Sequence, residues 1–235
     1  MIAEIVKEEL NSLGNSEKAQ HLSRFFKTGP GQYGAGDQFI GVRVPEQRRI
    51  AKRYKGLALE EIRHLLASPI HEHRLTGLLI LVERFATSGN ADTQREIVAF
   101  YRIHLDRVNN WDLVDLSAPK ILGEYLLRNP GERPILLTMV QSSNIWERRI
   151  AVLATWPMIK RNQFDELLDL AERLLTDTHD LMHKAVGWML REVGKVDLSI
   201  LEDFLEKHAR GMPRTMLRYA VERMDQERRR YFMQG

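Results

Sequence analysis

The chain has 235 residues, of which 43% are hydrophobic and 29% charged, and this balance excludes a largely disordered protein. It contains no cysteine, which excludes a disulfide scaffold, a cysteine zinc site, an iron–sulfur cluster and a thiol nucleophile. The formal net charge is only +3, but residues 207–235 hold 8 basic and 3 acidic side chains. Such a basic end favours a polyanionic partner or, equally, a solvated helical face.

Apolar residues recur at intervals of three and four along the chain, as at Ile62, Leu65 and Leu66, and this spacing is typical of helices. No stretch alternates apolar and polar residues convincingly in the way that a strand does. Start signals support the helices, since Pro45 suits the first turn of one and Asn110 suits the capping position of another. The predicted helices span residues 2–13, 16–27, 45–54, 58–67, 70–87, 91–106, 112–128, 132–141, 144–160, 163–176, 180–194, 198–209 and 213–226.

A weak internal repeat indicates how these helices are arranged. In three segments a small polar residue stands six positions before a basic one, and a small or apolar run follows. The segments run from Ser68 to Arg74, from Ser143 to Arg149 and from Thr178 to Lys184. A period of roughly 35–40 residues is typical of HEAT or armadillo helix pairs, which stack into a curved solenoid with one concave face. We therefore expect an all-α superhelix that forms a single domain over residues 1–235, with an irregular helical bundle as the alternative.

Residues 28–44 interrupt the helices with a long loop that contains five glycines. Loops of this length are usually functional or mobile. The loop lacks the Gly-Lys-Ser/Thr ending of a phosphate-binding loop, and no strand precedes it as a dinucleotide-binding fingerprint requires. It is either a functional segment or a surface connection that shapes the N-terminal helices.

Trp111 and Asp115 are four residues apart, so on a helix they share a face. A carboxylate beside an indole is a familiar catalytic pairing, because the aromatic wall lowers the local dielectric and can hold a cation. Asp112 lies three residues before Asp115 and suits the start of a helix. The alternative is a capping Asp and a Trp in the core.

Two further groups combine a Trp with basic residues. Arg149 lies three residues after Trp146 and shares its face, whereas the neighbouring Arg148 points elsewhere. On a concave face an Arg would be a bidentate phosphate ligand, and pairing with the following helix is the alternative. Lys184, Trp188 and Arg191 also follow one another at helical spacing, with Trp188 in the core or as a platform.

Gly187 precedes Trp188 in the middle of a predicted helix, where Gly is unfavourable by about 1 kcal/mol relative to Ala. It is tolerable if a neighbouring helix or a ligand approaches the backbone closely. Near the C-terminus Arg214 and Arg218 are one turn apart and aromatic residues lie among the basic ones. This pattern is consistent with binding a nucleic-acid backbone or with a solvated tail.

Taken together, these runs resemble the bacterial DNA alkylation repair glycosylases of the AlkD family over about residues 15–225. The resemblance lies in KTGPGQYGAGDQFIGVRVPEQRR, WDLVDLSAPKILGEYLL, NIWERRIAVL and KAVGWMLREVGK, in that order. It implies a solenoid of HEAT-like repeats whose concave basic face cradles duplex DNA. It also implies hydrolysis of the N-glycosidic bond of cationic N3- and N7-alkylpurines, with the lesion left in the duplex and not flipped out.

The resemblance assigns roles to individual residues. It makes Asp115 the catalytic carboxylate, Trp111 and Trp188 the indoles that face the deoxyribose, and Arg149 a ligand of the DNA backbone. An alkylpurine already carries a positive charge and leaves as a neutral base, so one carboxylate suffices where other glycosidases need two. We expect the DNA-binding surface to include Phe25, Arg148, Arg149, Lys184, Arg191, Arg214 and Arg218. Some members of the family carry Tyr in place of Phe25.

The remaining expectations concern partners and location. We expect duplex DNA with alkylated purines as the substrate, no metal, no small-molecule cofactor and a monomer. Although His179 and His183 are four residues apart, they have no evident third metal ligand. No apolar run approaches the ~20 residues of a membrane span, and no export signal is visible, so we expect a bacterial cytoplasmic protein that joins the nucleoid when bound to DNA. The rival functions are a non-catalytic DNA-binding relative and a HEAT-repeat scaffold for proteins.

Overall fold

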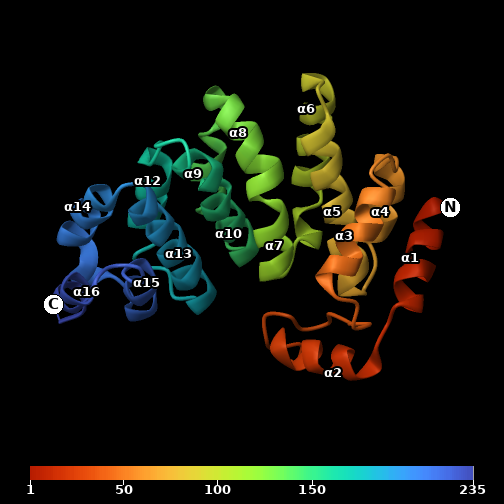
Figure 1. The fold of residues 1–235 in the computed structure, drawn as a ribbon, viewed down its shortest axis with the longest axis horizontal. Coiled ribbons are helices and arrows are strands. Elements are labelled where there is room, and N and C mark those ends of the chain that lie inside the picture. The colour runs from red at the N-terminus through yellow and green to blue at the C-terminus, as the bar shows by residue number, and fades with distance from the viewer. Residues whose placement is uncertain (235) are drawn as a thin grey trace. The chain divides into compact units, whose positions relative to one another are not determined.

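The computed structural model describes residues 1–234, which fold into helices joined by short connections and by one long loop between α2 and α3 (Figure 1). Within these residues there is no β-strand, and an isolated parallel bridge pairs Gln38 with Ile70. The predicted all-α class is therefore confirmed. Among the described residues no helix is both long and apolar enough to cross a membrane. The chain divides into two compact units, Met1–Ile121 and Leu122–Gly235, and the single repeat domain stays a prediction.

The first unit is built around α5, most of whose residues are buried and against which α3, α4, α6 and α7 pack. Its elements are α1 (Ile2–Ser12), α2 (Ser16–Phe25), α3 (Val44–Arg53), α4 (Leu59–Leu66), α5 (His71–Thr87), α6 (Ala91–Ile103), a 3-10 turn (Leu105–Arg107) and α7 (Trp111–Ser117). The Gly-rich loop connects α2 to α3, as expected, and its last predicted residue already belongs to α3.

The second unit is built around α13, against which α10, α12, α14 and α15 pack. A π-helical turn (Pro119–Gly123) precedes α8 (Glu124–Arg128), a 3-10 turn (Pro130–Glu132), α9 (Ile135–Met139), α10 (Ile145–Ala154), α11 (Trp156–Ile159), α12 (Asp165–Arg173), α13 (Asp180–Val196), α14 (Leu198–His208), a 3-10 turn (Ala209–Gly211), α15 (Arg214–Ala220) and α16 (Gln226–Gln234). A Cβ on Gly187 would overlap the carbonyl oxygen of Met216 in α15. A neighbouring helix therefore explains this glycine.

Most predicted helices differ from the observed ones by a few residues at their ends, and three differ by more. The helix predicted over 112–128 is interrupted by the π-helical turn that begins at Pro119, because a proline removes a hydrogen bond and crowds the preceding turn. The helix predicted over 144–160 breaks before Trp156-Pro157 for the same reason. The last predicted helix, 213–226, ends at Ala220, and α16 follows it. The polar sequence of α16 buries Phe232 alone and so has no apolar periodicity to detect.

The structure also corrects the register of the internal repeat. Arg74, the fourth residue of α5, donates from Nη1 to the carbonyl oxygens five and six residues before it, at 3.1 Å each. Arg148, the fourth residue of α10, makes the same two contacts at 3.1 and 2.9 Å. His183, the fourth residue of α13, contacts the carbonyl six residues before it at 2.5 Å. The equivalent basic residues are thus Arg74, Arg148 and His183, one position before Arg149 and Lys184 in the later copies.

Candidate functional site

Trp111 begins α7 and lies among aromatic side chains of the first unit. The Phe26 ring stacks on its indole with centroids 5.0 Å apart, and the Phe25 ring meets it edge-on at 5.8 Å. Asn110 caps the helix as predicted, since its side-chain oxygen accepts a hydrogen bond from the Trp111 N–H at 2.9 Å. Phe25 is 56% exposed and Trp111 is half-buried, so the fold brings these two predicted residues together with aromatic surface facing outward.

The two carboxylates of α7 have different surroundings. Asp115 lies one turn after Trp111, as the spacing predicts, and its residue is half-buried. Asp112 is buried: one of its oxygens accepts from the Leu113 N–H at 2.9 Å, and the other lies 2.8 Å from Nε2 of His71. Asp112 is therefore a structural acid of the helix start, whereas Asp115 is the carboxylate next to the exposed aromatic surface.

Asp112 belongs to a group of buried charged residues that we call the charged cluster: Asp37, His71, Arg74 and Asp112. The imidazole of His71 bridges the two acids, with Nδ1 3.1 Å from Asp37 and Nε2 2.8 Å from Asp112. The Arg74 guanidinium donates to the other oxygen of Asp37 at 2.5 Å, and the Asn110 amide donates to Asp37 at 3.0 Å. Asp37 comes from the Gly-rich loop, so the cluster joins that loop to α5 and α7.

The two acids determine the charge of His71. Burial by itself would lower the pKa of His71, but the carboxylates of Asp112 and Asp37 outweigh it and raise the pKa to about 9. Burial would raise the pKa of Asp37, but the hydrogen bond from His71 and the charge of Arg74 lower it overall. At neutral pH the charged cluster therefore pairs two carboxylates with one imidazolium and one guanidinium.

A second carboxylate ties the Gly-rich loop to α5. The buried Glu72 side chain accepts hydrogen bonds from the backbone N–H groups of Ile40, Gly41 and Val42, the shortest of them 2.7 Å. Gly41 has φ +83°, and a Cβ there would overlap the carbonyl oxygen of Asn15. The loop is therefore held in place by its contacts, at least from Asp37 to Val42, and is more than a solvated connection.

A cavity of about 420 Å³ lies between α2, the Gly-rich loop, α3 and α5. Its walls are mainly apolar and include Phe25, Phe26 and Phe39, and its charged lining includes His71 and Asp112. The charged cluster therefore borders this cavity beside the aromatic residues that contact Trp111.

The two adjacent arginines of α10 have different partners. Arg149 is only 5% exposed and donates from Nη1 to the carbonyl oxygen of Leu181 at 2.7 Å. Arg148 donates from Nε to Asp177 at 2.8 Å, in addition to the carbonyl contacts described above. One part of the guanidinium of each residue thus joins α10 to Asp177 and Leu181 around the start of α13, which is not the helix that follows α10 in the chain.

Trp188 is half-buried on α13, between the core and the surface. Its indole N–H donates to Glu192 at 3.1 Å, and its ring meets Trp156 edge-on at 5.2 Å. The ammonium of Lys160 lies over the Trp156 ring, 4.4 Å from its centroid. These contacts fix the orientation of the Trp188 ring and leave part of it accessible.

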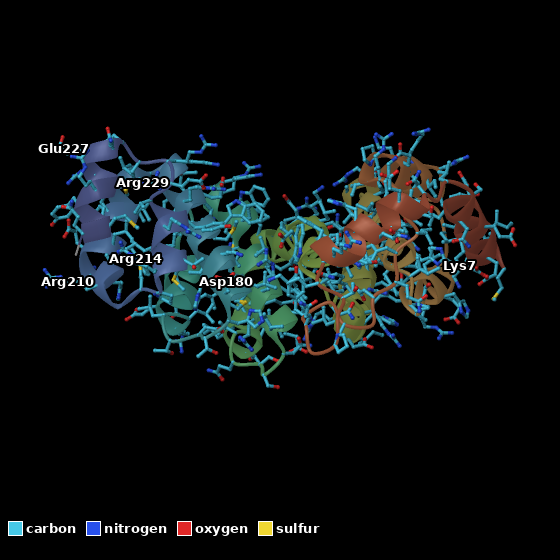
Figure 2. The ribbon with its side chains drawn as sticks, turned by 90° about the horizontal axis from the view of Figure 1, so that it is seen from below. Lys7, Asp180, Arg210, Arg214, Glu227 and Arg229 are labelled. Carbon is cyan, nitrogen blue, oxygen red and sulfur yellow. The ribbon has the colours of Figure 1, made fainter. Side chains whose placement is uncertain are left out.

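The predicted basic residues of the second unit include both paired and exposed side chains. Lys184 pairs with Asp180 at 2.7 Å, and Arg191 pairs with Glu222 of the segment after α15. Arg214 and Arg218 are exposed on α15. Figure 2 shows Arg214 on α15, Arg229 on α16 and Arg210 in the 3-10 turn before α15. The second unit therefore presents guanidinium groups at its surface, as a polyanion partner requires.

The predicted site residues divide between the two units: Phe25, Trp111 and Asp115 belong to the first, and Arg148, Arg149, Lys184, Trp188, Arg191, Arg214 and Arg218 belong to the second. Sequence reasoning missed the charged cluster, apart from a structural role for Asp112. The sequence does contain an Asp inside the Gly-rich loop, Asp37, and a His at the start of a helix, His71. Neither position, however, indicates which residue the side chain contacts in the folded chain. Among residues 1–234, no group of three or more His, Asp or Glu residues is arranged to hold a metal ion.

The family model described as DNA alkylation repair enzyme matches residues 6–224, and the chain belongs to this family. Among solved structures it is similar to a predicted DNA alkylation repair enzyme from Enterococcus faecalis, with a TM-score of 0.71 and 18% identity over 91% of this chain and 97% of that one.

Two structures from Streptococcus mutans are also similar. One is that of smu.31 from strain UA159, with a TM-score of 0.56 and 19% identity over 88% of this chain and 100% of that one. The other is that of AlkD2, with a TM-score of 0.57 and 18% identity over 89% of this chain and 98% of that one. No curated protein matches the chain. At these identities the solved structures show that the helical fold is shared.

Proposed function

We propose that this DNA alkylation repair family member is a DNA glycosylase that hydrolyses the N-glycosidic bond of cationic N3- and N7-alkylpurines in duplex DNA. The observation that carries the proposal is the exposed aromatic surface of Trp111 and Phe25 with the Asp115 carboxylate one turn away. Groups of these two kinds, a carboxylate and the faces of aromatic rings, stabilise a cationic sugar.

The chemistry needs few residues because the leaving group is already charged. An alkylpurinium departs as a neutral base, so no general acid has to protonate it. Positive charge then develops on the deoxyribose, where the Asp115 carboxylate stabilises it and orients or deprotonates the attacking water. The indole faces of Trp111 and Trp188 contribute on the order of 2 kcal/mol each at a desolvated site. In this proposal the base stays in the duplex throughout.

DNA binding is assigned to basic residues of the second unit and to the exposed ring of Phe25 in the first. Arg149, Arg191, Arg214, Arg218 and Lys184 supply positive charge for DNA phosphates in this proposal, and Phe25 supplies an apolar contact. The guanidinium of Arg148 already has three oxygen partners, so we expect its contribution to be mainly the support of α10. We further propose that the protein acts as a monomer in the bacterial cytoplasm.

The test is excision of 7-methylguanine from a defined duplex at low salt, with the wild type and Asp115→Asn compared side by side. The matched control is Asp106→Asn, because Asp106 is an exposed acid of the same unit that lies before α7. We expect release by the wild type and the control and loss of release in Asp115→Asn, with DNA affinity nearly unchanged. Excision by Asp115→Asn at the wild-type rate would show that another group performs the chemistry.

The second candidate function is DNA binding without catalysis, which the exposed arginines of α15 and the basic residues 207–235 favour. In that case neither the wild type nor Asp115→Asn releases base, and both bind DNA tightly with a steep dependence on salt. A protein-binding scaffold would bind DNA weakly and without that dependence.

A further inference from the structure

Three contacts join the charged cluster to the residue that begins α7. Asn110 is fully buried and contacts both the cluster and Trp111. Its amide donates to the Asp37 carboxylate at 3.0 Å, and its oxygen accepts from the Trp111 N–H at 2.9 Å. His71 contacts Asp112, the residue after Trp111, at 2.8 Å. The Phe26 ring lies 5.0 Å from the Trp111 ring and 5.1 Å from the His71 ring. The orientation of Trp111 is thus coupled to His71 in three ways: through the capping residue Asn110, through Asp112, and through the Phe26 ring, which contacts both side chains.

We propose that charged His71 is a positioning residue for the proposed glycosylase reaction: it holds the Gly-rich loop against the start of α7 and thereby orients Trp111 and Asp115 toward the DNA. It acts through Asp112 and Asn110 and does not touch the substrate. The inference rests on the proposed function, because positioning has a kinetic consequence only where α7 performs chemistry.

The positioning role requires the charged form of His71 because only this form has two N–H donors. An imidazolium has two N–H groups, and here each faces a different carboxylate, that of Asp37 and that of Asp112. A neutral imidazole has one N–H, so after deprotonation one buried carboxylate faces a nitrogen lone pair. Unpaired buried charges are strongly unfavourable, so the loop and the start of α7 are expected to separate.

Groups from several elements face His71 and determine the pH at which it loses its proton. Asp37 from the loop and Asp112 from α7 favour the proton, while the Arg74 guanidinium on the same helix opposes it. Phe26, at the end of α2, and Phe39, in the loop, cover the ring with centroids 5.1 and 4.6 Å away. The carboxylates of Asp112 and Asp37 outweigh the burial of the ring and the charge of Arg74 and raise the pKa of His71 to about 9, so the positioning role persists at neutral pH and is lost as the pH rises through about 9.

The first experiment is the pH dependence of single-turnover excision with saturating enzyme, for the wild type, Asp37→Asn and His71→Gln. The wild-type rate should fall as the pH rises through about 9, the pKa of His71. Asp37→Asn removes one of the two acids that hold the proton, so the fall should move to lower pH by about one unit or more. His71→Gln should reduce the single-turnover rate constant about tenfold to a hundredfold with little change in affinity for DNA, because it misplaces catalytic groups without removing DNA contacts.

The matched control is His73→Gln, since His73 lies two residues away on α5 and is equally buried, but its pKa is lowered to about 4 and it is neutral. This variant should keep the wild-type pH profile. A fall at the same pH in the wild type and in Asp37→Asn would belong to the substrate or to another group and would overturn the proposal. An unchanged single-turnover rate constant in folded His71→Gln would also overturn it.

A second experiment needs no reaction and no DNA. Titration of the His71 imidazole by NMR, followed together with the indole N–H resonance of Trp111 and amide exchange of the loop, should show all three changing near pH 9 in the wild type. Asp37→Asn should shift all three together. If the protein excises no base at any pH, the proposed function fails, while this titration still reports the coupling. Independent transitions of His71 and Trp111 would overturn the coupling itself.

Discussion

At the scale of single residues, His71 and His73 show how neighbours decide the charge of a buried side chain. Both lie on α5 and both are 2% exposed. Burial lowers the pKa of His73 to about 4, with the charge of Lys7 acting in the same direction, whereas two carboxylates raise the pKa of His71 to about 9. The stabilising contribution of His71 is therefore lost as the pH rises, whereas that of His73 is lost as the pH falls.

For His71 the folded pKa lies above the unfolded value of 6.5, so its stabilising contribution is complete below pH 6.5 and is lost as the pH rises through about 9. Urea unfolding of the wild type should therefore show a falling free energy of unfolding across this range. The fall should be reduced in His71→Gln and should remain in His73→Gln. An equal slope in the wild type and in His71→Gln would contradict the charged state of this residue.

For His73 the folded pKa lies below the unfolded value, so its stabilising contribution is complete above pH 6.5 and is lost as the pH falls toward about 4. The difference in unfolding free energy between the wild type and His73→Gln should shrink across this acidic range. The difference between the wild type and His71→Gln should not shrink there, because both folded and unfolded His71 are then charged.

At the scale of helices, glycines mark places where two elements come close. Gly187 permits the contact of α13 with α15, and Gly41 permits the contact of the loop with the start of α2. The sequence predicted both a helix through Gly187 and a close approach, but it left open whether a helix or a ligand approaches. The side-chain spacing of one helix says which face is apolar and does not say which neighbour covers that face.

Gly187→Ala tests this packing. In an isolated helix the change would be favourable by about 1 kcal/mol, but overlap of the new methyl group with α15 should make it unfavourable by about 1–3 kcal/mol. Thermal unfolding should show a lowered Tm. Gly56→Ala is the control, because nothing lies within 4 Å of a Cβ at Gly56. A Tm that rises in Gly187→Ala would mean that α13 and α15 separate easily.

At the scale of the whole molecule, the near-neutral net charge conceals a basic C-terminal region in the second unit. The exposed Arg214 and Arg218 belong to it, while the aromatic surface and Asp115 belong to the first unit. The proposed function therefore assigns the catalytic carboxylate to α7 of the first unit, an indole to each unit and most of the affinity to the arginines of the second unit.

Arg214→Ala should weaken DNA binding and reduce the slope of log affinity against log salt by about 0.9 for each DNA phosphate that the arginine neutralises in the wild type. The control is Arg173→Ala, which changes the net charge equally in the same unit but removes a side chain that pairs with Asp169 on α12. Fluorescence anisotropy over a range of salt measures both. Equal slopes in the two variants would show that net charge, and not direct phosphate binding by Arg214, accounts for the effect.

The features that depend on neighbours along the chain could be predicted from the amino-acid sequence. Apolar spacing predicted most of the helices, and the interval of four placed Asp115 one turn from Trp111, because a helix is held by hydrogen bonds between residues close in sequence. Asn110 was likewise predicted as a cap and is one.

Which distant segments meet could be seen only in the folded structure. Asp37 and His71 are 34 residues apart, and His71 and Asp112 are 41 apart, yet they form one buried cluster. Phe25 contacts Trp111 in the same way across a long stretch of chain. Such contacts are stabilised by burial of apolar surface and by pairing of opposite charges. Both effects depend on which residues are close in space, whatever their separation in sequence.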